Sequence, residues 1–134
     1  MSAPSSPPEE TVLVFDRDEE LFAYPSLTHV TNDLEAMDVE DAEYPAVYLP
    51  DGRVLELSAP DGYEGPVLLH RTGRTDLAGL ERRTARYWAR YGQRYWPGAA
   101  PLGPEEMARL LLAPEERSGG GVSRRLLRWL LRRP

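Results

Sequence analysis

The tripeptide Pro50-Asp51-Gly52 lies between two apolar runs, YPAVYL at Tyr44–Leu49 and RVLELS at Arg53–Ser58. Asp-Gly between such runs is the strongest short-range hairpin signal, because Gly readily adopts the positive φ that tight turns need. A chain with this hairpin contains antiparallel strands.

Two more strands and a helix are predicted before this hairpin. TVLVFDR (Thr11–Arg17) and LFAY (Leu21–Tyr24) flank the charged turn DEE and form a first hairpin. Ser26 can cap a following helix. Its apolar residues recur at helical spacing and are Leu27, Val30, Leu34 and Met37. The acidic run Asp38–Glu43 is expected to follow as a loop.

The second half predicts a fifth strand at Pro66–Arg71 and a long helix from Thr75 or Asp76 to about Gln93. One side of this helix carries Leu77, Leu80, Thr84, Tyr87, Trp88 and Tyr91, and the opposite side carries Arg82, Arg83, Arg86 and Arg90. A short helix begins at Pro104. We therefore predict an α+β fold, with a mostly antiparallel sheet of four to five strands and the two longer helices on one face.

A chain of 134 residues allows one hydrophobic core and is too short for two ordinary domains. The proline-rich start, residues 1–10, is expected to be a disordered leader without the features of a secretion signal. Residues 11–113 form the predicted domain, residues 114–121 a flexible Gly-rich linker, and residues 122–134 a tethered basic amphipathic helix.

The predicted C-terminal helix has an arginine side and a broad apolar side, which makes it a candidate contact for a partner or a membrane. Its candidate residues are Arg124, Arg125, Leu126, Leu127, Arg128, Trp129, Leu130, Leu131 and Arg132. A helix of about 12 residues is marginal alone in water and needs a surface. Three surfaces are open: its own domain, another protein, or an anionic membrane surface. At roughly 18 Å it is too short to span a bilayer core of about 30 Å.

Charge is divided along the chain. Residues 1–69 hold 16 acids and two arginines, whereas residues 70–134 hold six acids and 14 arginines. This division favours either attraction between the halves or separate partners. A dense acidic set predicts a surface for a basic protein, with a solvated loop and helix end as the alternative. The set comprises Asp33, Glu35, Asp38, Glu40, Asp41 and Glu43.

The strand followed by Asp16-Arg17-Asp18 resembles the D-x-D motif of haloacid-dehalogenase-like phosphatases. That resemblance implies Asp16 as nucleophile and Asp18 as acid and base of a Mg²⁺-dependent hydrolase. Glu19 and Glu20 stand where the family has Gly and Thr, and they add negative charge where a phosphate would arrive. A charged hairpin turn is the preferred interpretation.

No metal or cofactor site is predicted. The chain has no Cys, and its two histidines, His29 and His70, lie on different elements without metal-ligand spacing. Arginines beside aromatic residues on the long helix are a pattern also found in nucleic-acid-binding proteins. The helical period, however, places most of these arginines on the side opposite to the aromatic rings. A net charge of -6 also disfavours general polyanion binding.

Residues 12–57, which include LEAMDVEDAEYPAVYLPDGRVLEL, resemble small uncharacterised bacterial proteins of the toxin-immunity type. The resemblance implies stoichiometric binding of a basic toxin by an acidic surface. We therefore expect a non-catalytic binding or adaptor protein with another protein as partner. Attachment to a membrane surface and phosphatase activity are the alternatives. The absence of Cys, of a secretion signal and of a long apolar run favours the cytoplasm, with attachment to the inner face of the membrane as a variant.

Overall fold

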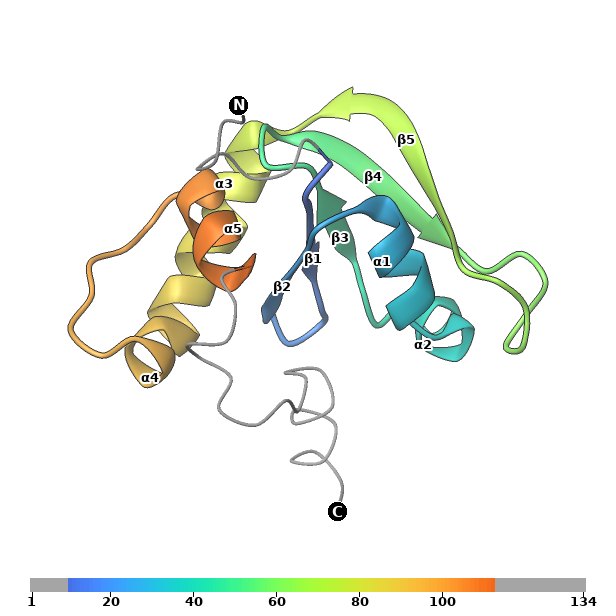
Figure 1. Ribbon diagram of the computed structural model, residues 1–134, viewed down its shortest axis with the longest axis horizontal. Helices are drawn as coiled ribbons and strands as arrows, with labels where there is room; N and C mark the ends of the chain where they lie inside the picture. Colours follow the sequence, from blue (N-terminus) through green and yellow to red (C-terminus); the bar gives the residue numbers. More distant parts are fainter. Residues whose placement is uncertain (1–9, 113–134) are drawn as a thin grey trace, which may run out of the picture.

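A computed structural model describes residues 10–112, which form a five-stranded sheet with helices on both of its faces (Figure 1). The predicted leader lies outside these residues except for Glu10, and the linker and C-terminal helix lie wholly outside them. In chain order the elements are β1 (Val12–Phe15), β2 (Leu21–Tyr24), α1 (Leu27–Asp33), α2 (Ala36–Glu40), β3 (Ala46–Tyr48), β4 (Arg53–Ser58), β5 (Leu68–Thr75), α3 (Leu77–Tyr87), a π-helical turn η1 (Trp88–Gly92), α4 (Gln93–Tyr95) and α5 (Pro104–Leu112).

The sheet has the order β2-β1-β3-β4-β5, and every neighbouring pair is antiparallel. The predicted α+β class, both hairpins and the number of strands are confirmed. In the second hairpin the N–H of Gly52 donates to the carbonyl of Leu49 at 2.9 Å, and Gly52 has φ 100°. This conformation is open to Gly because it lacks a Cβ. β5 is displaced from its predicted range and runs on through Gly73 to Thr75.

The two faces of the sheet carry separate hydrophobic clusters. Leu13 and Phe15 point to α3 and α5, where they meet Leu80, whereas Val12 and Val14 point to α1. This alternation follows from the period of two in a strand. Figure 1 shows α3, α4 and α5 on one side of the sheet and α1 and α2 on the other. The prediction that both longer helices share one face is therefore corrected.

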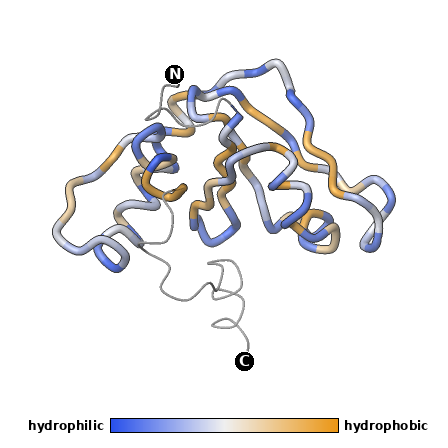
Figure 2. Tube along the Cα trace, viewed as in Figure 1, coloured by the Kyte–Doolittle hydropathy of each residue, from blue (hydrophilic) through white to orange (hydrophobic). Residues whose placement is uncertain are grey.

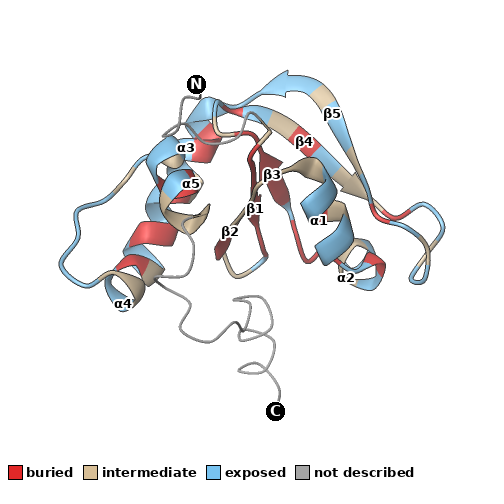
Figure 3. Cartoon of the chain, in the orientation of Figure 1, coloured by how far each residue is buried: buried red, intermediate tan, exposed pale blue. Residues whose placement is uncertain are grey.

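All four residues of β1 are buried, as Figure 3 shows for this strand and for β3. Figure 2 shows the same central strands as hydrophobic. A strand that is apolar at every position requires cover on both faces. Helices on opposite faces of the sheet supply this cover.

The predicted helix over residues 26–37 is two short helices. Ser26 caps α1 as expected, since its side chain accepts a hydrogen bond from the His29 N–H at 3.2 Å. α1 ends at Asp33, because the next residue, Leu34, is extended with φ -81° and ψ 144°. α2 then begins inside the residues expected to prolong the first helix and includes part of the expected acidic loop. Met37 is consequently 45% exposed and not part of the core.

The long predicted helix begins where expected. The Asp76 carboxylate caps it by accepting from the Gly79 N–H at 3.0 Å. It continues as α3, η1 and α4 to Tyr95, with Leu80, Tyr87 and Trp88 buried against the sheet. Leu77, predicted on the buried stripe, is 46% exposed because it lies in the first turn, at the rim of the core.

Candidate functional site

The acidic surface predicted from sequence lies on α1 and α2. Asp33 ends α1, Glu35 precedes α2, and Glu40 and Asp41 end α2, all with exposed side chains. Asp38 is partly buried in the middle of α2. We refer to Asp33, Glu35, Asp38, Glu40 and Asp41 as the acidic surface. The break between the two helices thus distributes these carboxylates along both segments, on one side of the molecule.

Two tyrosines orient carboxylates of the acidic surface. The Tyr24 hydroxyl donates to Asp33 Oδ2 at 2.6 Å, and the Tyr63 hydroxyl donates to Asp41 Oδ1 at 3.0 Å. The hydrogen bond to Asp41, and then the charge of Asp41, raise the pKa of Tyr63 above its ordinary value. These neutral donors leave the negative charge of both carboxylates uncompensated. None of the five ion pairs between described residues involves Asp33, Glu40 or Asp41.

Glu43, predicted to belong to the same surface, is buried at 4% exposure. Its Oε1 lies 2.9 Å from Nη2 of Arg17, which reaches it from the β1–β2 turn. The Glu43 carbonyl also accepts from the Arg17 N–H at 2.8 Å. Glu43 therefore joins two loops and is removed from the partner-binding set.

The helical layers on the two faces of the sheet have opposite charge. Residues 26–43 contain six acids and no arginine, whereas residues 77–95 contain five arginines and one glutamate. Arg82, Arg86 and Arg90 are exposed while Tyr87 and Trp88 are buried, as the helical period predicts. Ion pairs from Glu19 to Arg86 and to Arg90, at 3.4 and 3.6 Å, connect the two halves of the chain. Such exposed pairs contribute about 0–1 kcal/mol each.

Asp16 has a role inside the first hairpin. It is 1% exposed, and its Oδ1 accepts from the N–H groups of Asp18 and Glu20 at 2.8 and 3.0 Å. Glu19 completes this tight turn with φ 69°. The carboxylate therefore points back into its own loop, which is the geometry of the charged hairpin turn. A nucleophilic carboxylate would have to face a substrate, and this placement gives the phosphatase alternative no support.

Both histidines are exposed, and each forms a hydrogen bond with a serine side chain. His29 Nδ1 lies 2.7 Å from Ser26 Oγ, and His70 Nε2 lies 3.2 Å from Ser58 Oγ. Within residues 10–112, no group of three or more His, Cys, Asp or Glu residues is arranged to hold a metal ion. In the same part of the chain, no helix combines the length and apolarity needed to cross a membrane. The nine tail residues predicted as a partner or membrane contact lie outside the described residues.

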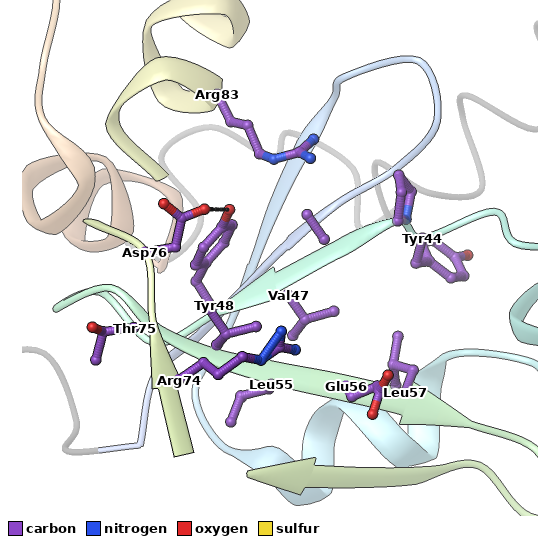
Figure 4. Close-up of a pocket in the computed structure, with 13 residues that line it drawn as sticks. Tyr44, Val47, Tyr48, Leu55, Glu56, Leu57, Arg74, Thr75, Asp76 and Arg83 are labelled. Carbon is purple, nitrogen blue, oxygen red and sulfur yellow. Dashed lines mark hydrogen bonds between the residues drawn. The ribbon is translucent and has the colours of Figure 1, made fainter. Parts of the chain in front are cut away.

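A cleft that was not predicted from the sequence lies on the face of the sheet opposite to the acidic surface, beside the start of α3 (Figure 4). It has a volume of about 520 Å³. We call it the β3–β4 cleft. Its lining includes Ala46, Tyr48, Val54, Glu56, Arg74, Asp76 and Arg83. Arg74 and Arg83 come from different elements, so the sequence carries no local signal that they share one cavity.

Comparison of the chain with family models, with curated proteins and with solved structures gives no significant match. The resemblance to toxin-immunity proteins therefore stays a prediction. The functional argument depends on the charges and contacts of the described residues.

Proposed function

We propose that this chain is a non-catalytic binding protein whose acidic surface engages a basic protein, in the manner of an immunity protein that neutralises a toxin. The observation that carries the proposal is the separation of charge between the two helical layers. An acidic layer without arginine attracts a basic partner, and the arginine-bearing layer on the opposite face repels it. The partner is thereby directed to one side of the molecule.

The contacts of the acidic surface support this proposal. Asp33 and Asp41 are exposed and held by tyrosine hydroxyls, so they are oriented while they keep their charge. Met37, 45% exposed, and Tyr63, 54% exposed, add apolar area beside these carboxylates. Protein interfaces commonly combine such an apolar centre with a charged rim.

The C-terminal segment, residues 122–134, enters the proposal as a second contact, which engages the same partner or an anionic membrane surface. Its arginines and leucines suit either surface. We place the protein in the cytoplasm. This compartment is reducing and its proteins rarely contain disulfides, which fits a chain without Cys. Two contacts carried by one chain raise the effective concentration for the second binding step.

The test compares two double variants that change the net charge equally. Glu40→Gln with Asp41→Asn neutralises part of the acidic surface, whereas Glu81→Gln with Glu105→Gln neutralises exposed acids elsewhere. Each tagged protein is used to capture partners from the cells that produce it, and the captured basic protein is then purified for affinity measurements. We expect about tenfold weaker binding for the first variant and nearly unchanged binding for the second.

A truncated chain, residues 1–118, tests the C-terminal segment in the same assay, with circular dichroism as the check of folding. The second contact is supported if the truncated chain is folded but no longer captures the partner or no longer sediments with anionic vesicles. Equal affinities for both charge variants would contradict the proposal and leave the acidic surface as a solvated helix end. If the truncated chain is unfolded, the C-terminal segment is needed for folding and is not a separate contact.

A further inference from the structure

The β3–β4 cleft has an apolar floor and two cationic side chains at its border. Ala46 and Tyr48 of β3 are buried and Val54 of β4 is partly buried. Figure 4 shows Arg83 projecting from α3 and Arg74 from β5 over these strands. Arg74 is exposed and Arg83 is partly buried, so both guanidinium groups are accessible from the cleft.

Neither arginine is neutralised within the described part of the chain. The ion pairs between residues 10–112 use Arg17, Arg53, Arg71, Arg86 and Arg90. Arg74 and Arg83 are absent from this set. Each guanidinium group therefore adds a positive charge to the cleft that no described ion pair offsets, and both charges attract an anion to it.

The acidic residues of the cleft do not take that position. Asp76 accepts a hydrogen bond from the Gly79 N–H at 3.0 Å, and its Oδ2 lies 3.5 Å from the Tyr48 hydroxyl. Asp76 is therefore engaged in starting α3, and it fixes the direction of the helix that carries Arg83. Figure 4 shows Glu56 beside Leu57, at the end of the cleft away from Asp76. Glu56 would repel a second anionic group at that end.

We propose that the β3–β4 cleft binds a small organic acid, whose carboxylate or phosphate is attracted by the positive charges of Arg74 and Arg83 and whose apolar body lies on Ala46 and Val54. A planar guanidinium forms paired hydrogen bonds with either anion, which makes two arginines a suitable recognition element. A cavity of about 520 Å³ lies in the range of small-molecule sites. This site is independent of the proposed protein-binding function, because the acidic surface lies on the opposite face of the sheet.

Three probes with the same aromatic ring separate the two acids from a neutral analogue: phenyl phosphate, benzoate and benzamide. Each is titrated into the full-length isotope-labelled protein, and the backbone amide signals of Tyr48, Glu56 and Thr75 are followed by NMR. We expect saturable shifts with at least one acid and none with benzamide. Binding of only one acid would show whether the cleft prefers a phosphate or a carboxylate. Binding of both would show that it accepts either anion.

Arg74→Gln and Arg83→Gln are each expected to weaken binding by about tenfold. Arg82→Gln is the matched control, because Arg82 neighbours Arg83 on α3 but does not line the cleft. This variant should change the affinity less than twofold, because salt screens the exposed charge of Arg82 from the cleft. Because Arg74 is exposed on β5, its variant tests the site even where Arg83→Gln fails to fold. The proposal is overturned by unsaturable shifts with both acids, by benzamide binding as tightly as benzoate, or by Arg82→Gln weakening binding as much as the cleft variants.

Discussion

Replacing Gly92 with Ala tests the packing of the aromatic cluster on α3, η1 and α4. Gly92 has φ -58° and ψ -45°, which are ordinary helical values, so the backbone conformation does not require Gly. A Cβ at this position, however, would lie 2.7 and 2.8 Å from Cδ2 and Cε2 of Trp88. Trp88 is 6% exposed, and its ring is stacked on Trp96 with centroids 5.9 Å apart. The indole therefore has little room to move away.

Two opposing terms decide the sign of the effect. Gly to Ala in a helix interior stabilises by about 0.5–1 kcal/mol, because Ala loses less backbone entropy on folding. Overpacking a buried site costs about 1–3 kcal/mol. We therefore expect Gly92→Ala to lower the free energy of unfolding by about 1 kcal/mol, which for a domain near this size lowers Tm by about 4–8 °C. Urea unfolding followed by Trp fluorescence measures the change.

A double-mutant cycle with Trp88→Leu attributes the loss to the indole ring. Leu is smaller and its side chain can turn away, so Gly92→Ala in this background should stabilise by the helix-propensity difference of about 0.5–1 kcal/mol. Near-UV circular dichroism reports whether the stacked Trp88 and Trp96 rings are displaced in the single variant. A stabilising effect of Gly92→Ala in the native background would refute the steric argument, as would the same loss in both backgrounds.

Two other changes test hydrogen bonds at the first hairpin, one made by Asp16 and one by Tyr91, whose hydroxyl donates to the Asp18 carbonyl at 3.0 Å. Asp16→Ala removes the acceptor for two N–H groups and should cost about 1–3 kcal/mol in urea unfolding, whereas Asp16→Asn keeps an acceptor oxygen and should cost less; equal losses would contradict the structural role. Burial, and then the charge of Glu20, raise the pKa of Tyr91 above its ordinary 10.0, so its contribution to stability is complete below that pH and is lost as pH rises through the raised pKa. Tyr91→Phe should therefore lose less stability than the wild type between pH about 9 and about 11, and identical pH dependences would show that Tyr91 is not responsible.

Local turn chemistry predicted the sheet, because each hairpin is encoded within a few neighbouring residues. Pro50-Asp51-Gly52 forms the expected turn, and the helix cap at Ser26 is confirmed. The placement of the helices was available from TVLVF as well, since an unbroken apolar run in an antiparallel strand indicates burial on both faces. The prediction of one covered face overlooked that signal. The break after α1 was less accessible, because Leu27, Val30, Leu34 and Met37 keep a helical period across it.

The candidate sites were predictable only where exposure follows from helical position. Asp33, Glu40 and Asp41 are exposed as expected, but the burial of Glu43 depends on Arg17 from a distant turn. The β3–β4 cleft is beyond local patterns. It requires β5 to run to Thr75 and α3 to begin two residues later, so that Arg74 and Arg83 border the same strands.

The arrangement of charge about the sheet constrains how any complex is built. A basic protein on α1 and α2 approaches the negative layer and is kept from the arginines of α3 by repulsion. The proposed small acid would have the opposite preference, because the cleft with Arg74 and Arg83 lies on the other face. The two proposed partners would therefore bind on opposite faces of the sheet. Added salt should weaken the protein complex more than the cleft complex, since exposed charges are screened while a group partly enclosed by the protein is screened less.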